Sequence, residues 1–138
     1  MPKTESFEIF ALSTSLNEMQ MCLKINQLLH IDLQRKSPIT VTIKKNEVQP
    51  ACFSSEDTLR RVTVTLIDNK SITPTLDFFK NISFFIKISP VNSESQINEI
   101  HQTLASCNEF LFIQKIEKDK TPLNKQQSAT FNSLFQYV

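Results

Sequence analysis

The sequence predicts an α+β domain with one mostly antiparallel sheet of five to six strands and two helices packed on it. Several short segments alternate apolar and polar residues with the period of two that is typical of strands, whereas only two segments follow the 3, 4 spacing of a helix face. The order is β-α-β-β-β-β-α-β, and its successive strands favour antiparallel pairing over repeated βαβ units. We expect a single domain over 1–138, in which 1–5 and 117–130 are flexible.

The first part of the chain predicts a strand and then a helix. Residues 7–12 are apolar on both faces, as in an interior strand. Ser15 and Glu18 have the spacing of a capping box, so we expect a helix over 16–30. Its apolar stripe includes an asparagine, whose buried amide would need backbone partners. The stripe consists of Met19, Cys22, Leu23, Asn26 and Leu29, and it is widened by Ile25 and Leu28.

Four strands are predicted between this helix and the next. A basic turn at 34–37 precedes them. The strictest alternation is in the first and third strands, and the second is a weaker candidate. In the fourth, Phe84 and Phe85 fall on opposite faces. The four strands cover residues 39–44, 51–53, 62–67 and 82–88.

The last part of the chain predicts a second helix and a final strand. Ser93 and Gln96 form a second capping box. A narrow stripe then predicts a helix that lies on the surface of the sheet, and a strand follows at 110–113. The chain ends in apolar residues that form a final helical turn or dock on the core. The helical stripe is Ile97, Ile100, Leu104 and Cys107, and the terminal residues are Phe131, Leu134, Phe135 and Tyr137.

Glycine is absent from the chain. Phosphate-binding loops such as GxGxxG and GxxxxGK[ST] need glycine for a close backbone approach, so Rossmann-type dinucleotide binding, P-loop chemistry and the GxSxG hydrolase elbow are excluded. Left-handed turn positions are expected at asparagine and aspartate instead, such as Asn46, Asn69 and Asn108.

Charge and cysteine content narrow the classes further. The net charge of +1 provides no broad field for nucleic acid or anionic membranes. No apolar run approaches the length of about 18 residues that a membrane span needs. The three cysteines are widely spaced, which is typical of free thiols in a reducing compartment, so we expect a cytoplasmic protein.

An enzyme with a cysteine- or carboxylate-based site is one alternative. Its candidates are Cys52 with His30 or His101, or Glu56 with Asp57 as a general acid and base. No CxxC or HxxxH spacing occurs, so we expect neither a metal nor a cofactor.

An RNA-binding module is a further alternative. It would depend on Lys44, Lys45, Arg60 and Arg61 lining one face of the sheet. Acidic residues lie next to these groups, so the charge pattern favours a solvated surface over a track for phosphates.

The chain contains eleven phenylalanines, which is more than one face of a small sheet needs. They either enlarge the core or form an apolar patch that a homodimer or another protein covers. We interpret the protein as a small binding module that interacts with another protein or with itself. The expected interaction surface consists of Phe78, Phe79, Phe85, Phe131 and Phe135.

Residues 12–35 resemble the opening of the IPExxxVDY family of small bacterial proteins. The similar positions are Leu23, Asn26, Leu29, Leu33 and Arg35, together with a Leu-Ile-x-Asn-Lys turn at 66–70 and a strand at 82–88. The motifs that name the family are changed here, to Leu-Asp-Phe at 76–78 and Ile-Ser-Phe at 82–84. The resemblance implies a bacterial cytoplasmic protein and no particular site.

Overall fold

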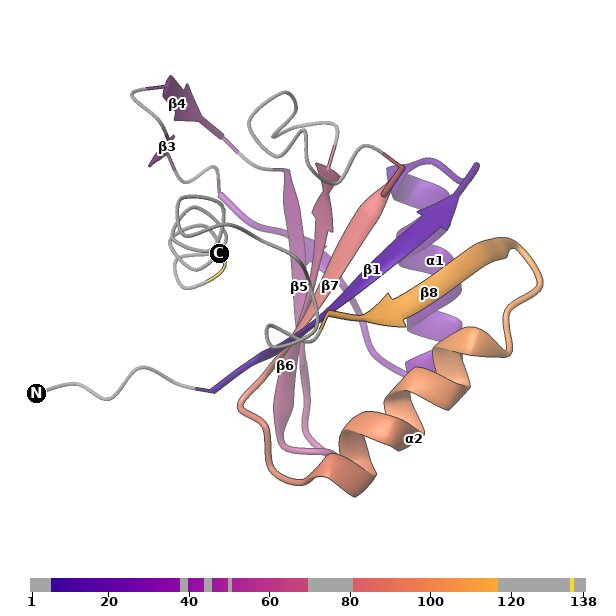
Figure 1. Ribbon diagram of the computed structural model, residues 1–138. Helices are drawn as coiled ribbons and strands as arrows, with labels where there is room; N and C mark the ends of the chain where they lie inside the picture. The colour runs from indigo at the N-terminus through magenta and orange to yellow at the C-terminus, as the bar shows by residue number, and fades with distance from the viewer. Residues whose placement is uncertain are drawn as a thin grey trace, which may run out of the picture.

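The computed structural model describes residues 6–37, 40–43, 46–49, 51–69, 81–116 and 135. Within them a six-stranded antiparallel sheet has the order β2-β5-β6-β7-β1-β8. Two helices cover one side of this sheet (Figure 1). The predicted α+β class, with one mostly antiparallel sheet of five to six strands and two helices packed on it, is therefore confirmed. The sheet strands are β1 (Glu8–Thr14), β2 (Gln34–Arg35), β5 (Cys52–Asp57), β6 (Val62–Asp68), β7 (Phe84–Ser89) and β8 (Phe110–Lys115).

Helix α1 (Glu18–Leu29) has its N-cap two residues later than the predicted capping box, at position 17 and not 15. Asn17, in extended conformation, is the N-cap: its side chain accepts from the Gln20 amide, and the Gln20 side chain accepts from the Asn17 amide. The predicted box of Ser15 and Glu18 is therefore wrong. An asparagine oxygen two residues along satisfies the same open amides of the first turn.

The buried face of α1 agrees with the prediction at Ile25 and Leu29 and differs from it at Met19 and Leu23. Met21, Ile25 and Leu29 are buried, whereas Met19 is 74% and Leu23 59% exposed. The apolar residues of this helix fit two overlapping stripes, and the spacing of four between the buried residues matches the side that contacts the sheet.

Helix α2 (Glu94–Ala105) follows the prediction more closely. Ile97, Ile100 and Leu104 are buried beneath it. Ser93 accepts from the Gln96 amide at 3.1 Å, but the Gln96 side chain donates to the Arg60 carbonyl at 2.9 Å instead of closing the box. The start of α2 is therefore tied to the turn between β5 and β6.

The middle strands need three corrections. The predicted basic turn contains β2, and the weak candidate at 51–53 is the full strand β5. The predicted strand at 39–44 is β3 (Val41–Ile43), which, within the described residues, pairs with β4 (Asn46–Val48) and not with the main sheet. Alternation gives a strand's period but does not say which sheet it joins.

Left-handed backbone occurs in the described residues at His30, with φ of 58°, and Arg61, with φ of 59°. The prediction that Asn46, Asn69 and Asn108 take these positions is wrong. His30 ends α1, and Arg61 ends the β5–β6 turn. At both positions the chain changes direction, where glycine is the usual residue because it adopts a positive φ freely. This sequence has no glycine, so a histidine and an arginine take the left-handed conformation.

The core lies between the sheet and the helices. Phe84 and Phe85 point to opposite faces, as predicted: Phe84 joins this core, and Phe85 contacts Phe135 on the other side of the sheet. The predicted flexible segments 1–5 and 117–130 lie outside the described residues. The core includes Phe10 and Leu12 of β1, Val62, Val64 and Leu66 of β6, Phe84, Ile86 and Ile88 of β7, and the buried faces of α1 and α2.

Candidate functional site at the β8 edge

Strand β8 forms one outer edge of the main sheet, where β1 is its only neighbouring strand among the described residues. The Ile116 amide donates to the Ile9 carbonyl at 2.8 Å, just beyond the last strand residue. In an antiparallel ladder the residues that bond the neighbour alternate with residues whose backbone groups point away. Because Ile116 faces β1, Gln114 and Phe112 do so as well, whereas Ile113 directs its backbone groups outward.

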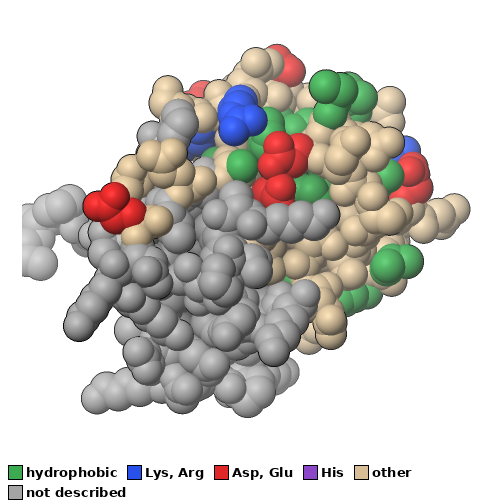
Figure 2. Space-filling view, turned by 90° about the horizontal axis from the view of Figure 1, so that it is seen from above, with side chains coloured by type: hydrophobic (Ala, Val, Ile, Leu, Met, Phe, Trp, Pro, Cys, Tyr) green, Lys and Arg blue, Asp and Glu red, His purple; other side chains and the backbone are tan. Residues whose placement is uncertain are grey.

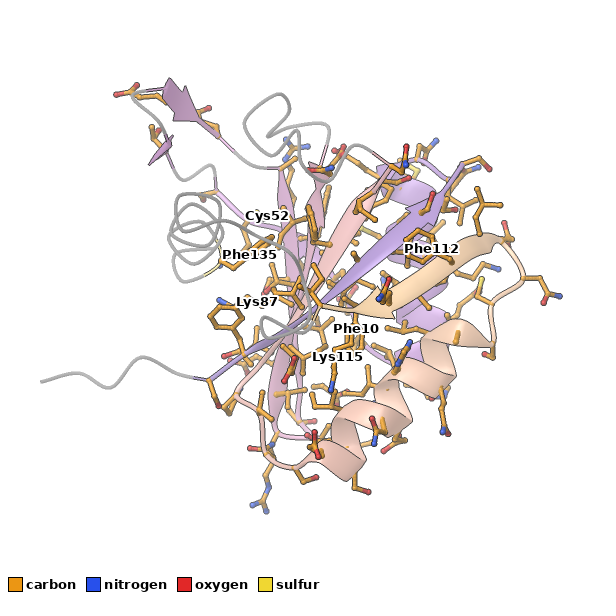
Figure 3. All side chains as sticks on the ribbon, viewed as in Figure 1. Phe10, Cys52, Lys87, Phe112, Lys115 and Phe135 are labelled. Carbon is orange, nitrogen blue, oxygen red and sulfur yellow. The ribbon has the colours of Figure 1, made fainter. Side chains whose placement is uncertain are left out.

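Two apolar side chains at this edge are exposed. Leu111 is 78% and Phe112 41% exposed. The register passes from Ser13 opposite Phe112 to Thr14 opposite Phe110, so Leu111 is the extra residue of a bulge. Phe112 lies on β8 at the rim of the sheet (Figure 3). An outward backbone and an apolar rim therefore coincide on one strand.

His101 of α2 supports this edge from the helix side. Its ring centroid lies 5.2 Å from that of Phe10, and its Nε2 lies 3.3 Å from the Ile113 carbonyl oxygen. Because a carbonyl only accepts, the Nε2 of His101 is the donor. The Ile113 carbonyl keeps a second acceptor site, and the outward amide of Ile113 has no partner among the described residues.

The start of β8 is also held in place. Glu109 pairs with Lys24 of α1 at 2.7 Å, and the Thr14 hydroxyl donates to the Glu109 carbonyl at 2.9 Å. Phe110 is buried in the core. These contacts hold the start of β8 in place from both α1 and β1.

The predicted phenylalanine surface is placed differently. Phe85 and Phe135 are both fully buried, and their rings meet edge to face at 5.1 Å. Their contact is intramolecular and neither side chain is exposed. Figure 3 shows Phe135 on the side of the sheet away from the helices. Phe78, Phe79 and Phe131 lie outside the described residues.

The proposed cysteine–histidine pairs are not brought together. Cys52 is opposite Ile67 and in the same row as Phe85, on the face away from the helices. His101 contacts Phe10 on the helix face, and His30 ends α1. Burial raises the pKa of the Cys52 thiol to about 11, which lowers its thiolate fraction at neutral pH.

The proposed pair of Glu56 and Asp57 is also separated. Adjacent residues of a strand point to opposite faces. Asp57 is buried and accepts from the Arg60 guanidinium at 2.6 Å, whereas Glu56 is exposed on the other side. Asp57 is therefore committed to an ion pair and is no general acid for its neighbour.

Among the described residues, the basic side chains proposed for RNA binding do not line one face of the sheet. Arg60 bonds Asp57, Glu99 and the Leu29 carbonyl, so its charge is neutralised within the fold. Arg61 is exposed at the same turn, and Lys44 and Lys45 lie outside the described residues.

The carboxyl groups of Glu18 in α1 and Asp68 in β6 lie close together, which no sequence pattern predicted. A hydrogen bond to Asp68, burial and the Asp68 charge raise the pKa of Glu18 above its ordinary value, and Arg35 opposes this. Figure 2 looks down on the end of the molecule where α1 begins and shows acidic and basic side chains close together among hydrophobic ones. Burial also raises the pKa of Cys22 to about 11, with a contribution from Glu18. The described residues contain no group of three or more ligands that could hold a metal ion.

Sequence reasoning missed Leu111 and Phe112. The run Phe-Leu-Phe-Ile at 110–113 is apolar without alternation, which is typical of an interior strand. The only available signal was the polar pair Gln114 and Lys115 that follows it. Whether a strand lies at an edge is decided by the order of pairing, which no local pattern contains.

Comparison with known proteins finds no family model that matches this chain and no match among curated proteins. In the part of the chain that the structure describes, none of the helices has the length and hydropathy required to cross a membrane.

Proposed function

We propose that this chain is a protein-interaction module that adds an extended segment of a partner to the outer edge of β8. The observation that carries the proposal is the coincidence, on one strand, of outward backbone groups at Ile113 with exposed apolar side chains at Leu111 and Phe112. In strand addition, main-chain hydrogen bonds supply affinity, and alternate side chains supply selectivity.

The composition of the edge supports recognition over protection. Edge strands are usually blunted by charges, prolines or very short length, because open edges promote aggregation. β8 has six residues, and its leucine at 111 is 78% exposed. Its bulge restricts pairing to the straight part after Leu111, which limits the edge to a defined register.

The proposal includes a bacterial cytoplasmic setting, which the resemblance to the IPExxxVDY family implies. The three free thiols Cys22, Cys52 and Cys107 agree with a reducing compartment. Cell fractionation tests this part: recovery in the soluble cytoplasmic fraction supports it, and recovery in a secreted or envelope fraction contradicts it.

A matched pair of variants tests the interaction. Leu111→Lys places a charge on the β8 edge, and Leu59→Lys makes the same change at a residue that is 89% exposed in the β5–β6 turn. The tagged protein is purified from its native host, and its companions are quantified. We expect a stoichiometric protein companion, or a second copy, that Leu111→Lys loses and Leu59→Lys keeps. Equal retention by both variants would contradict the proposal.

A further inference from the structure

We infer that the segment that pairs with β8 is the β8 strand of a second copy of this chain, antiparallel, with a twofold axis at Ile113. The inference rests on the proposed function and names its partner. The result would be a homodimer in which the two six-stranded sheets continue into one another.

The backbone geometry places the axis. Outward groups occur at alternate residues of an antiparallel edge, and the contact of Ile116 with Ile9 assigns Ile113 to the outward set. Ile113 is also the outward residue in the middle of the strand's straight part. Two copies related by a twofold axis there exchange both amide-to-carbonyl bonds between their Ile113 residues. The His101 contact can remain, because a carbonyl oxygen accepts two hydrogen bonds.

The side chains are self-complementary in this register. Leu111 lies opposite the partner's Lys115, whose methylene stem can cover it, and Phe112 lies opposite the partner's Gln114. The two Lys115 residues are four positions apart across the axis, or about 14 Å at the strand rise, which exceeds the Debye length in physiological salt. An axis at Lys115 itself would place two like charges directly opposite each other.

The rest of the molecule favours a closed pair over a chain of copies. The other edge, β2, has two exposed residues, Gln34 and Arg35, and presents no apolar rim to a β8 strand. A head-to-tail contact between β8 and β2 is therefore disfavoured, and the isologous β8 contact remains. The net charge of +1 opposes neither copy's approach.

Sedimentation equilibrium of the full chain tests the association. We expect the wild type and Leu59→Lys to have the mass of two chains at micromolar concentration. We expect Leu111→Lys to have the mass of one, with a dissociation constant raised at least about tenfold, which corresponds to about 1.4 kcal/mol. Circular dichroism checks that each variant is folded, and we expect both to be, because each substitution is at an exposed position. A dimer that Leu111→Lys leaves intact overturns the inference and also removes the support for the β8 edge.

Disulfide trapping tests the register. Chains carrying Phe112→Cys and chains carrying Gln114→Cys are oxidised separately and as a mixture, and peptide mapping identifies the linkages. We expect a linkage between 112 and 114 in the mixture alone, because these positions face each other only across the axis at Ile113. The native thiols are common to all samples and provide the background. A linkage of Phe112→Cys chains to themselves would move the axis to Phe112 and contradict the inference.

The outcomes separate the two proposals. A wild type that is monomeric at every concentration overturns self-pairing. If it still retains a different protein that Leu111→Lys loses, recognition at β8 stands with another partner. If it retains none, both proposals fail.

Discussion

The two edges of the sheet differ in length and chemistry. β2 pairs with β5 over two residues, Gln34 and Arg35, and both are exposed and polar. β8 has six residues, of which five pair with β1, and it exposes Leu111 and Phe112. One edge of the same sheet is thus short and charged, and the other is long and apolar.

The two edges also differ in the contacts that they make within the chain. Arg35 lies 5.7 Å from the centre of the Phe53 ring and takes part in the electrostatics of Glu18, so β2 is occupied by contacts within the chain. At β8 the main contact within the chain is the hydrogen bond from His101 to the Ile113 carbonyl oxygen. The backbone amide of Ile113 still points outward. Protection of one edge and exposure of the other is the pattern expected of a sheet that pairs on one side.

The largest expected effect is a difference in the free energy of unfolding between variants of β1, which pairs with β8, and of β5, which pairs with β2. Phe10 of β1 is fully buried beside His101, so Phe10→Ala should lower the free energy of unfolding by about 3–5 kcal/mol. Phe53 of β5 is half-buried, and its contact with Arg35 contributes about 0.5–1 kcal/mol, so Phe53→Ala should cost less. Urea unfolding measures both. Equal losses would show that the two edges are supported alike.

A pH series tests the charged contacts near β2. Because the pKa of Glu18 is raised in the folded state, its contribution to stability is present below its ordinary pKa and is lost as pH rises through the raised value. Glu18→Gln should remove this loss and raise Tm near neutral pH relative to the wild type. Glu94→Gln changes the equivalent first residue of α2, which is exposed, and serves as the control. If the two variants give the same pH profile, the pairing of Glu18 with Asp68 has no energetic role.

The smallest effect concerns the support of β8. His101→Phe keeps a ring against Phe10 but removes the hydrogen bond to Ile113, so we expect a loss of about 0.5–1.5 kcal/mol. Thermal unfolding of the variant measures it. His101→Gln retains a donor and should recover part of the loss. A His101→Phe protein as stable as the wild type would remove His101 from the account of this edge.

Much of the fold could be predicted because the decisive patterns are local. β6 alternates cleanly, and the spacing of Ile97, Ile100 and Leu104 gave the buried side of α2 correctly. In α1 the same method chose Met19 and Leu23, because apolar residues surround most of that helix and two stripes fit it. Only contact with the sheet decides between such stripes.

The candidate site could not be predicted because it depends on pairing between distant segments. β8 is an edge strand because it pairs with β1, which comes from the other end of the chain. The other side of β1 pairs with β7, so β8 is the last strand in the sheet order. The phenylalanine surplus suggested a surface, but Phe85 and Phe135 use their rings to bury each other. The predicted interaction module therefore remains a proposal, with its surface moved from those rings to Leu111 and Phe112.

Amide hydrogen exchange at Ile113 tests the central claim most directly. Its amide points outward from β8, whereas that of Gln114 faces β1, so Gln114 serves as an internal reference in the same strand. The account predicts that Ile113 is protected at high protein concentration and exchanges faster on dilution or in Leu111→Lys, while Gln114 stays protected throughout. Rapid exchange at Ile113 under all these conditions, with the native companion present, would show that nothing pairs with this edge.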